Sequence, residues 1–170
     1  MKSLKPILFL LITVTNVHSF ASEKDKSFQE QSMLSVLYVQ TSTEFAANNI
    51  QTFNNASKAL DMALKDKTWT AALEKKDSFV SKDPAIIVDV DETVLDNSSF
   101  QSRTILSGLS YPNGWAKWVN ESKASAVEGV YEFLHYAKES KVKFFYVTNR
   151  LESFREPTIR NLKTLGLPFD

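Results

Sequence analysis

Residues 84–98, which read PAIIVDVDETVLDNS, decide the fold of this chain. The run Ala85–Val90 is apolar apart from Asp89 and is rich in β-branched residues. A continuous run of this kind is typical of a strand in a parallel sheet whose two faces are both covered. We therefore expect a buried strand that ends in two carboxylates, Asp89 and Asp91.

A second apolar run, VKFFYV, covers residues 142–147. Between the two runs, apolar residues at helical spacing predict a connecting helix, and Ser125 and Glu128 have the spacing of a capping box at its start. The stripe of this helix consists of Val127, Val130, Phe133, Leu134 and Ala137. Another helix is expected after the second strand, with Pro157 as its first residue and Gly166 at its end. Strands that alternate with helices predict an α/β fold with a parallel sheet.

The connection between the two strands is longer than a simple crossover requires. Asp89 and Thr148 are 59 positions apart, whereas a whole β-α-β unit needs about 30 residues. We therefore expect an inserted, cap-like region at about 94–124, beyond the carboxyl end of the first strand. Its aromatic residues are Phe100, Tyr111, Trp115 and Trp118. We expect Trp118 to pack in the core, whereas lining a pocket and packing are equal alternatives for the other three.

The first 21 residues have the features of a signal peptide. Lys2 and Lys5 precede a short apolar run, and small residues lead to Ala21, after which we expect cleavage. The apolar run is far shorter than the ~20 residues of a membrane-spanning helix. The sequence therefore predicts a periplasmic or secreted protein without a membrane anchor after cleavage.

Residues 22–82 are expected to form an amino-terminal helical region. Between Phe28 and Lys65, apolar residues recur at steps of three and four and form a stripe that needs a partner surface. Its members are Ala46, Ile50, Phe53, Ser57, Leu60 and Leu64. Asparagine is a mediocre helix former, so we expect a break near Asn48–Asn49 or Asn54–Asn55.

The composition excludes several classes of protein. Lysine plus arginine (20) equals aspartate plus glutamate (20), and no basic run is present, so nucleic acid is not an expected partner. The absence of cysteine excludes disulfides, thiolate nucleophiles and cysteine-based zinc sites. Two histidines are too few for a histidine-rich metal site, and four glycines form no glycine-rich phosphate loop. A phosphate group must be held by other means.

Asp89, Asp91 and Thr148 are the candidate chemical groups. Residues i and i+2 of an extended chain project to the same side, and ligands of parallel sheets bind beyond the carboxyl ends of the strands. Two close carboxylates repel, so Mg²⁺ is the expected neutralising ion, and it would also bind a phosphate oxygen. One carboxylate can then attack phosphorus while the other acts as acid and base. Thr148 would supply a hydroxyl, and Asn149 a backbone N–H, to the phosphate oxygens.

Other structures for the aspartate motif are a solvated turn or a calcium loop. A calcium loop does not fit, because Val94 stands where that loop needs glycine and Phe100 where it needs glutamate. A solvated turn becomes a weaker alternative once a second strand that ends in Thr148 follows through a helix.

Two motifs resemble those of a known family. The segments 89–98, DVDETVLDNS, and 145–150, FYVTNR, are similar to the first and second motifs of secreted acid phosphatases of the haloacid dehalogenase (HAD) superfamily. The similarity is to subfamily IIIB, with its class B and lipoprotein e-type nucleotidases. It extends to segments 38–44, 129–134 and 158–166 and to the spacing of Tyr111, Trp115 and Trp118.

The resemblance implies a HAD-like Rossmannoid fold and the metal-dependent hydrolysis of phosphomonoesters, including nucleoside monophosphates, through an aspartyl phosphate. It implies that Asp89 is the nucleophile and a metal ligand, and that Asp91 is the acid/base and a metal ligand through its carbonyl. Thr93 would orient the loop and Thr148 would hold phosphate. The leaving-group pocket would be bordered by Phe100 and Tyr111, with Trp115 as a further candidate.

The resemblance also implies that part of the family pattern is missing. The family's third motif, a lysine, and fourth motif, a pair of aspartates, follow the second motif, and the sequence ends at Asp170. Lys163 lies on a charged helix face and is not favoured as a substitute for the lysine. We therefore expect residues 83–170 to be a partial phosphatase core with an incomplete sheet, truncated after the second motif. The alternative is an inactive protein that binds phosphate or nucleotide, or one that binds a partner through residues 46–64.

Overall fold

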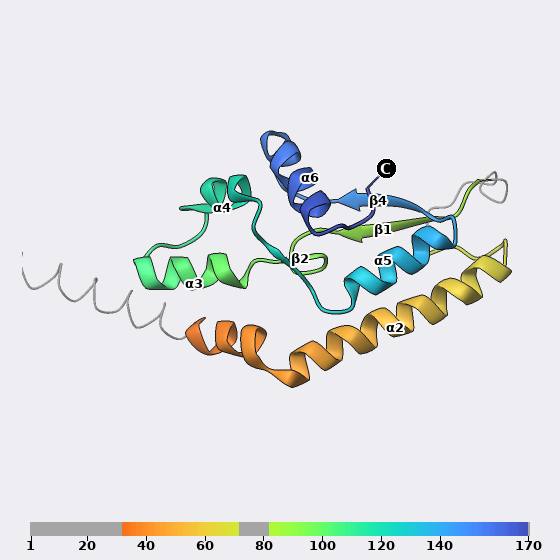
Figure 1. Cartoon of the computed structure of the whole chain (residues 1–170), viewed down its shortest axis with the longest axis horizontal. Coiled ribbons are helices and arrows are strands. Elements are labelled where there is room, and N and C mark those ends of the chain that lie inside the picture. The colour runs from red at the N-terminus through yellow and green to blue at the C-terminus, as the bar shows by residue number, and fades with distance from the viewer. Residues whose placement is uncertain (1–31, 72–81, 170) are drawn as a thin grey trace, which may run out of the picture.

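A computed structural model of the chain describes residues 32–71 and 82–169. The predicted signal peptide lies outside the described residues. Figure 1 shows the arrangement of the elements along the chain. After a helix at 32–41 come α2 (Thr43–Lys65), β1 (Ala85–Asp89), β2 (Leu95–Asp96), α3 (Ser98–Ser107), α4 (Trp115–Glu121), β3 (Ser125–Ala126), α5 (Val130–Glu139), β4 (Lys143–Val147), a 3₁₀ turn (Glu152–Phe154) and α6 (Arg155–Thr164). In this part of the chain no helix has both the length and the apolarity needed to cross a bilayer.

Strands β1 and β4 pair in parallel, which confirms the predicted α/β fold. Their register places Ile87 beside Phe145 and Asp89 beside Val147. Strands β2 and β3 form a separate, short antiparallel pair. In the described ranges the parallel sheet thus has two strands, in agreement with the expected incomplete sheet.

The two faces of the parallel sheet differ, and the expectation that both are covered is wrong for the described residues. Val88 is 7% exposed, whereas its neighbour Ile87 is 75% exposed. Phe145 and Val147 on β4 are also exposed. Because side chains alternate along a strand, the helices cover only the side that carries Val88.

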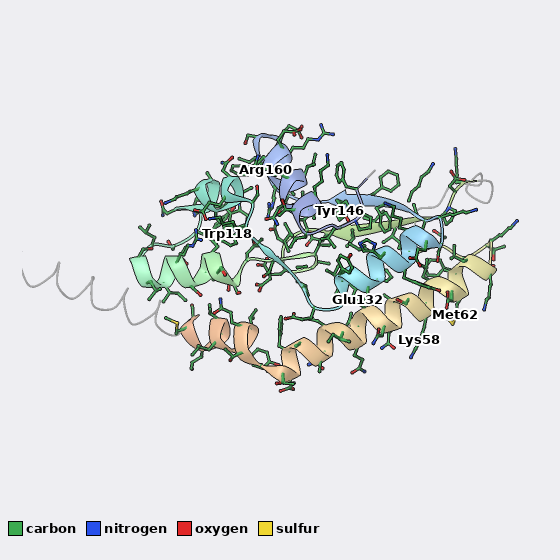
Figure 2. The ribbon with its side chains drawn as sticks, viewed as in Figure 1. Lys58, Met62, Trp118, Glu132, Tyr146 and Arg160 are labelled. Atoms are coloured by element: carbon green, nitrogen blue, oxygen red, sulfur yellow. The ribbon has the colours of Figure 1, made fainter. Side chains whose placement is uncertain are left out.

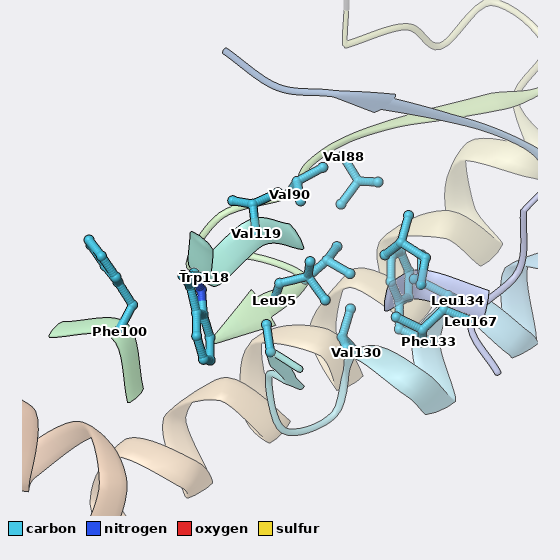
Figure 3. Close-up of a cluster of buried hydrophobic side chains, with 13 residues drawn as sticks. Val88, Val90, Leu95, Phe100, Trp118, Val119, Val130, Phe133, Leu134 and Leu167 are labelled. Atoms are coloured by element: carbon cyan, nitrogen blue, oxygen red, sulfur yellow. The ribbon is translucent and has the colours of Figure 1, made fainter. Parts of the chain in front are cut away.

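One buried cluster joins the sheet to its helices (Figure 3). The cluster includes Val88 from β1, Val90 just after that strand, Leu134 from α5 and Leu162 from α6. It continues to Trp118 of α4, which is 3% exposed and confirms the core position expected from the sequence. Full burial of such an apolar side chain stabilises a fold by roughly 1.5–3 kcal/mol.

The predicted apolar stripe of the amino-terminal region packs inside the chain. Helix α2 runs alongside α5 (Figure 1), and the Phe53 and Phe133 rings lie 5.7 Å apart. The helices approach closely at Gly129, where a Cβ atom would stand 3.0 Å from the Cα of Ile50. Lys58 and Met62 are exposed on α2 (Figure 2). The stripe therefore contacts α5, while Ile50 remains 45% exposed. Binding of a partner through residues 46–64 stays a prediction.

The helix break lies at Ser42 rather than at either asparagine pair. Ser42 has an extended backbone, and its hydroxyl oxygen accepts a hydrogen bond from the Phe45 N–H at 3.2 Å. Serine is a preferred amino-terminal cap because it satisfies a free N–H of the first turn. Packing on α5 keeps α2 helical through both asparagine pairs, so tertiary contact overrides weak propensity.

Two helix starts differ from prediction. Ser125 belongs to β3, and α5 begins at Val130 after Gly129, so the capping box of Ser125 and Glu128 is not formed. Helix α6 begins before Pro157, at Arg155, because the 3₁₀ turn leads directly into it.

The predicted end of α6 is confirmed. Gly166 has a φ of 69°, and the Leu167 N–H donates to the Leu162 carbonyl at 3.0 Å. This closing bond satisfies one of the last carbonyls of the helix, and the left-handed backbone that it requires suits glycine.

Candidate active site

The first motif forms a tight loop directly after β1. The N–H groups of Val94 and Leu95 both donate to the Val90 carbonyl, at 3.0 and 2.8 Å. Glu92 takes a left-handed backbone, with a φ of 56°, which non-glycine residues adopt uncommonly. The loop thus folds back on itself and brings the residues after Asp89 to the end of the sheet.

Asp89 is the last residue of β1, and its side chain is exposed. The Thr93 hydroxyl lies 3.5 Å from its Oδ2 atom. Thr93 is four residues after Asp89 in the sequence, and the loop brings its side chain back to Asp89. An exposed carboxylate at the carboxyl end of a parallel strand is accessible to a ligand.

Asp91 lies in a different environment, paired with Arg150. The Arg150 Nη2 donates to Asp91 Oδ1 at 2.6 Å, and its Nε lies 3.0 Å from Oδ2 and 3.2 Å from Oδ1. The side chain of Arg150 is 5% exposed and that of Asp91 is 19% exposed. A two-pronged, partly buried pair of this kind fixes the carboxylate in position as well as in charge.

Asn97 and Trp118 hold Asp91 from the other direction. Asn97 Nδ2 donates to Asp91 Oδ1 at 2.8 Å, and Trp118 Nε1 donates to Asn97 Oδ1 at 2.8 Å. Asn97 is 2% exposed, so its amide is desolvated and needs both partners. The site thus has a buried polar support that reaches α4.

The second motif brings Thr148 and Asn149 to the same edge. Val147 pairs with Asp89, so Thr148 follows directly after the end of the paired region. The Arg150 N–H donates to the Thr148 hydroxyl oxygen at 3.1 Å, which orients this side chain. The contact of Thr148 and Asn149 with phosphate stays a prediction.

A cavity of about 640 Å³ opens beside Asp91. Asn149 and Arg150 line its polar part. The Trp115 ring lies 5.0 Å from Phe100 and 6.0 Å from Tyr111, both at steep angles. The predicted pocket residues Phe100, Tyr111 and Trp115 therefore lie together in one wall of the cavity. The whole cavity is lined by Asp91, Glu92, Asn97, Phe100, Gln101, Tyr111, Pro112, Trp115, Ala116, Asn149, Arg150, Leu151 and Phe154. Asp89, Thr93 and Thr148 lie outside this lining.

The surroundings of Glu92 in this loop shift the pKa of its side chain. Partial desolvation raises the pKa of the Glu92 carboxyl, and the nearby charge of Asp91 acts in the same direction. Hydrogen bonds from Asn97 oppose the shift. Glu92 lines the cavity, so its charge is part of the field that a ligand meets there.

The donor set suits a magnesium ion that keeps most of its water. In residues 32–71 and 82–169, no cluster of three or more acidic or histidine side chains forms a ready metal cage. Asp89 offers one exposed carboxylate, and Mg²⁺ is commonly bound through one or two carboxylates together with water and phosphate oxygens. The carboxylate of Asp91 is already neutralised by Arg150, which leaves its carbonyl as the further ligand implied by the resemblance.

Two other candidates lie outside the site. The His135 ring nitrogen Nε2 lies 2.9 Å from the Gly166 carbonyl, and its ring packs on Tyr131. Lys163 lies over the Phe169 ring on α6. Neither side chain lines the cavity, and for Lys163 this agrees with the sequence, which did not favour it as a substitute for the family's lysine.

Arg150 and Asn97 are the residues to which sequence reasoning gave no role. Arg150 stands two positions after Thr148 at the carboxyl end of a strand, and a cation beside two expected carboxylates was a usable signal. Asn97 had no comparable signal, because its role depends on Trp118, 21 residues away.

Comparison with known proteins agrees with this geometry. A family model described as HAD superfamily, subfamily IIIB (acid phosphatase) matches residues 12–170. The chain therefore belongs to the subfamily IIIB acid phosphatases of the HAD superfamily.

Solved structures support the same conclusion. Two structures of the class C acid phosphatase from Bacillus anthracis, one with tungstate bound, match with 35% sequence identity and a TM-score of 0.72. The match covers 82% of this chain and 54% of that chain. This chain thus spans about half the length of that relative.

Proposed function

We propose that this chain carries the nucleophile and the acid/base group of a metal-dependent acid phosphatase that hydrolyses phosphomonoesters, including nucleoside monophosphates. The observation that carries the proposal is the contrast at the end of β1, where Asp89 is exposed and Asp91 is held by Arg150 beside a cavity. Membership of the family supports it. The relative from Bacillus anthracis binds tungstate, an oxyanion like phosphate, and this supports the proposal that the present chain also binds an oxyanion.

The reaction that we propose has two steps. An Asp89 oxygen forms a bond to phosphorus while the ester P–O bond breaks, and the leaving oxygen takes the proton that Asp91 carries when the substrate is bound. Water then attacks the phosphorus of the aspartyl phosphate, gives its proton to Asp91 and releases phosphate together with the free Asp89 carboxylate. Thr93 orients the loop through its contact with Asp89.

The phosphoryl group needs donors for its negative oxygens. The Thr148 hydroxyl and the Asn149 N–H are the proposed donors, in place of a glycine-rich loop. Mg²⁺, held by the Asp89 carboxylate and the Asp91 carbonyl, would neutralise charge on the phosphoryl oxygens.

The organic part of the substrate is proposed to occupy the aromatic wall of the cavity. Phe100, Tyr111 and Trp115 form that wall, and flat rings suit an aromatic leaving group such as a nucleoside. We further propose removal of residues 1–21 as a signal peptide and a periplasmic or secreted location, which sequencing the amino terminus of the exported protein would test.

The decisive experiment is hydrolysis of p-nitrophenyl phosphate with and without Mg²⁺. Asp89→Asn keeps the shape but removes the nucleophile, so turnover should fall by about 10³-fold or more. Asp83→Asn is the matched control, because Asp83 is an exposed carboxylate just before the opposite end of β1, and it should retain the wild-type rate. Equal rates for wild type and Asp89→Asn would reject the proposal.

A second candidate is a protein that binds phosphate or nucleotide without turnover. The cavity beside Asp91 and its aromatic wall favour this candidate, because they could hold such a ligand without any chemical step. Calorimetric titration with tungstate in the presence of Mg²⁺ distinguishes the two candidates. Tungstate binding without hydrolysis would support the second function, whereas hydrolysis that EDTA abolishes and Mg²⁺ restores would support the first.

A further inference from the structure

We propose that Arg150 and Asn97 are positioning residues that hold the Asp91 carboxylate in a single orientation, with Trp118 as the distant anchor of the chain of contacts. The inference deepens the proposed function and rests on it, because the held carboxylate is the proposed acid/base group. Neither side chain is assigned a contact with the reacting atoms.

The orientation of Asn97 follows from its partners. The Trp118 indole N–H can only donate, so the atom 2.8 Å from it must be the Asn97 carbonyl oxygen Oδ1. The amide nitrogen then points the other way, where it lies 2.8 Å from Asp91 Oδ1 and donates to it. With Asn97 and Trp118 only 2% and 3% exposed, water does not compete for these bonds.

Arg150 is fixed by Thr158 at one edge and by Trp115 on one face. Its Nη1 donates to the Thr158 hydroxyl oxygen at 2.9 Å, and that hydroxyl donates to the Phe154 carbonyl at 2.7 Å. The guanidinium also lies 5.2 Å from the centre of the Trp115 ring. A planar fork held on its far edge and on one face presents its remaining N–H groups to Asp91 in one direction.

The two oxygens of Asp91 therefore differ. Oδ1 receives hydrogen bonds from Asn97 Nδ2 and Arg150 Nη2, at 2.8 and 2.6 Å. Oδ2 has the Arg150 Nε at 3.0 Å. Oδ1 accepts from two residues and serves as the anchor. Oδ2 accepts from Arg150 alone, so it is the oxygen proposed to carry the proton for the leaving group.

The same contacts link the carboxylate to the pocket wall. Trp115 is a wall residue and packs against the Arg150 guanidinium. Thr158 belongs to α6, and Trp118 to α4. The position of Asp91 is thus set jointly by the inserted region and by the helix that follows the second motif.

The kinetic test compares Arg150→Met, Arg150→Lys and Asn97→Ala with Arg155→Met, an exposed arginine of the same segment. We expect Arg150→Met to lower kcat by about 10²-fold with little change in KM, since misplacing a reacting group by about 1 Å costs that much. Arg150→Lys should recover part of the loss because it restores one donor but not the fork. Arg155→Met should equal wild type. A Met variant with unchanged kcat, or one altered only in KM, would overturn the inference.

A second readout does not depend on turnover. The chain has three tryptophans, Trp69, Trp115 and Trp118, and each gives one indole N–H signal in a ¹H–¹⁵N spectrum. Arg150→Met should shift the Trp118 signal, because Arg150 is linked to Trp118 through Asp91 and Asn97. It should also shift the Trp115 signal, because Arg150 packs directly on that ring. The Trp69 signal, and all three signals in Arg155→Met, should stay in place. A Trp118 signal unmoved in Arg150→Met would contradict the proposed chain of contacts.

Two further measurements keep the outcomes separable. Thr158→Val removes only the hydroxyl that contacts Arg150. It should shift the Trp118 signal and lower kcat in the same direction as Arg150→Met, but by less. This variant tests the inference if Arg150→Met does not fold. If the wild type shows no turnover, the proposed function fails, and the indole spectra alone decide whether Arg150 and Asn97 hold Asp91.

Discussion

The two sides of the β1–β4 sheet show how differently one short stretch of sequence can be used. On one side, Val88 and Val90 enter a buried cluster with Leu134 and Leu162. On the other side, Ile87, 75% exposed, leads to Asp89 at the end of the strand.

The same difference separates the two carboxylates of the first motif. Asp89 ends the open side and is free to meet a ligand, whereas Asp91 is held by Arg150 and Asn97. Neighbouring carboxylates in unlike environments are a known way to divide nucleophile and acid/base roles. The covered side of the sheet therefore provides the stability of the fold and also supports the position of Asp91.

The largest effect on the free energy of unfolding is expected for a substitution on the covered side of the sheet. Leu134→Ala removes a side chain with no exposed surface and should lower the free energy of unfolding by about 2–5 kcal/mol. Urea denaturation followed by circular dichroism measures this change. A loss below about 1 kcal/mol would show that the α5 side is not the core of the molecule.

A smaller loss is expected where α6 is tied to the inserted region. Asn161 donates to the Ala124 carbonyl at 2.8 Å and accepts from the Ala124 N–H at 3.0 Å, and all of these groups are buried. Figure 2 labels Arg160 on α6 and Trp118 on α4, two helices that are in contact. Asn161→Ala leaves two buried groups unpaired and should cost about 1–3 kcal/mol, measured in the same way. Asn120→Ala, at an exposed position, is the control and should cost much less.

The ion pair of Asp83 and Lys143, at the start of β1 and β4, makes a pH-dependent contribution to the stability of the fold. The hydrogen bond from Lys143 and its charge hold the pKa of Asp83 below its ordinary value. A lowered pKa in the folded state stabilises the fold at neutral pH, and this stabilisation is lost as the pH falls below the ordinary aspartate range. Asp83→Asn should therefore flatten the acid limb of the stability curve slightly. Identical curves from pH 7 to pH 2.5 would contradict the prediction.

The smallest effect is expected on the open side. Ile87→Thr replaces an exposed apolar side chain with another β-branched residue, so its free energy of unfolding should stay within about 0.5 kcal/mol of wild type. Because exposed apolar surface binds the dye ANS, fluorescence of added ANS should decrease. A loss comparable to that of Leu134→Ala would mean that the Ile87 side is buried in solution.

Local patterns predicted much of this fold. The runs around Ile87 and Phe145 became paired parallel strands, the Val130 to Ala137 stripe became α5, and Gly166 ends α6 as expected. The start of α5 was wrong, because Ser125 is used in β3. A capping pattern is short and competes with strand pairing, which depends on residues remote in sequence.

The sequence named candidate residues for the site but not the contacts between them. Asp89 is the last residue of β1 and Thr148 follows β4, and Phe100, Tyr111 and Trp115 share a cavity wall. The partners of Asp91 were not predicted, because Arg150 is 59 residues away in sequence. Their approach depends on how the inserted region folds back over the sheet.

The order of strands and helices, and the carboxylates at the tip of the first strand, could be derived from the sequence by itself, because apolar periodicity and strand geometry act over a few neighbouring residues. Only the tertiary structure decided which face of the sheet is covered and which aspartate is bound by Arg150. Those outcomes depend on contacts between distant segments, where burial and the need to satisfy desolvated polar groups select one arrangement.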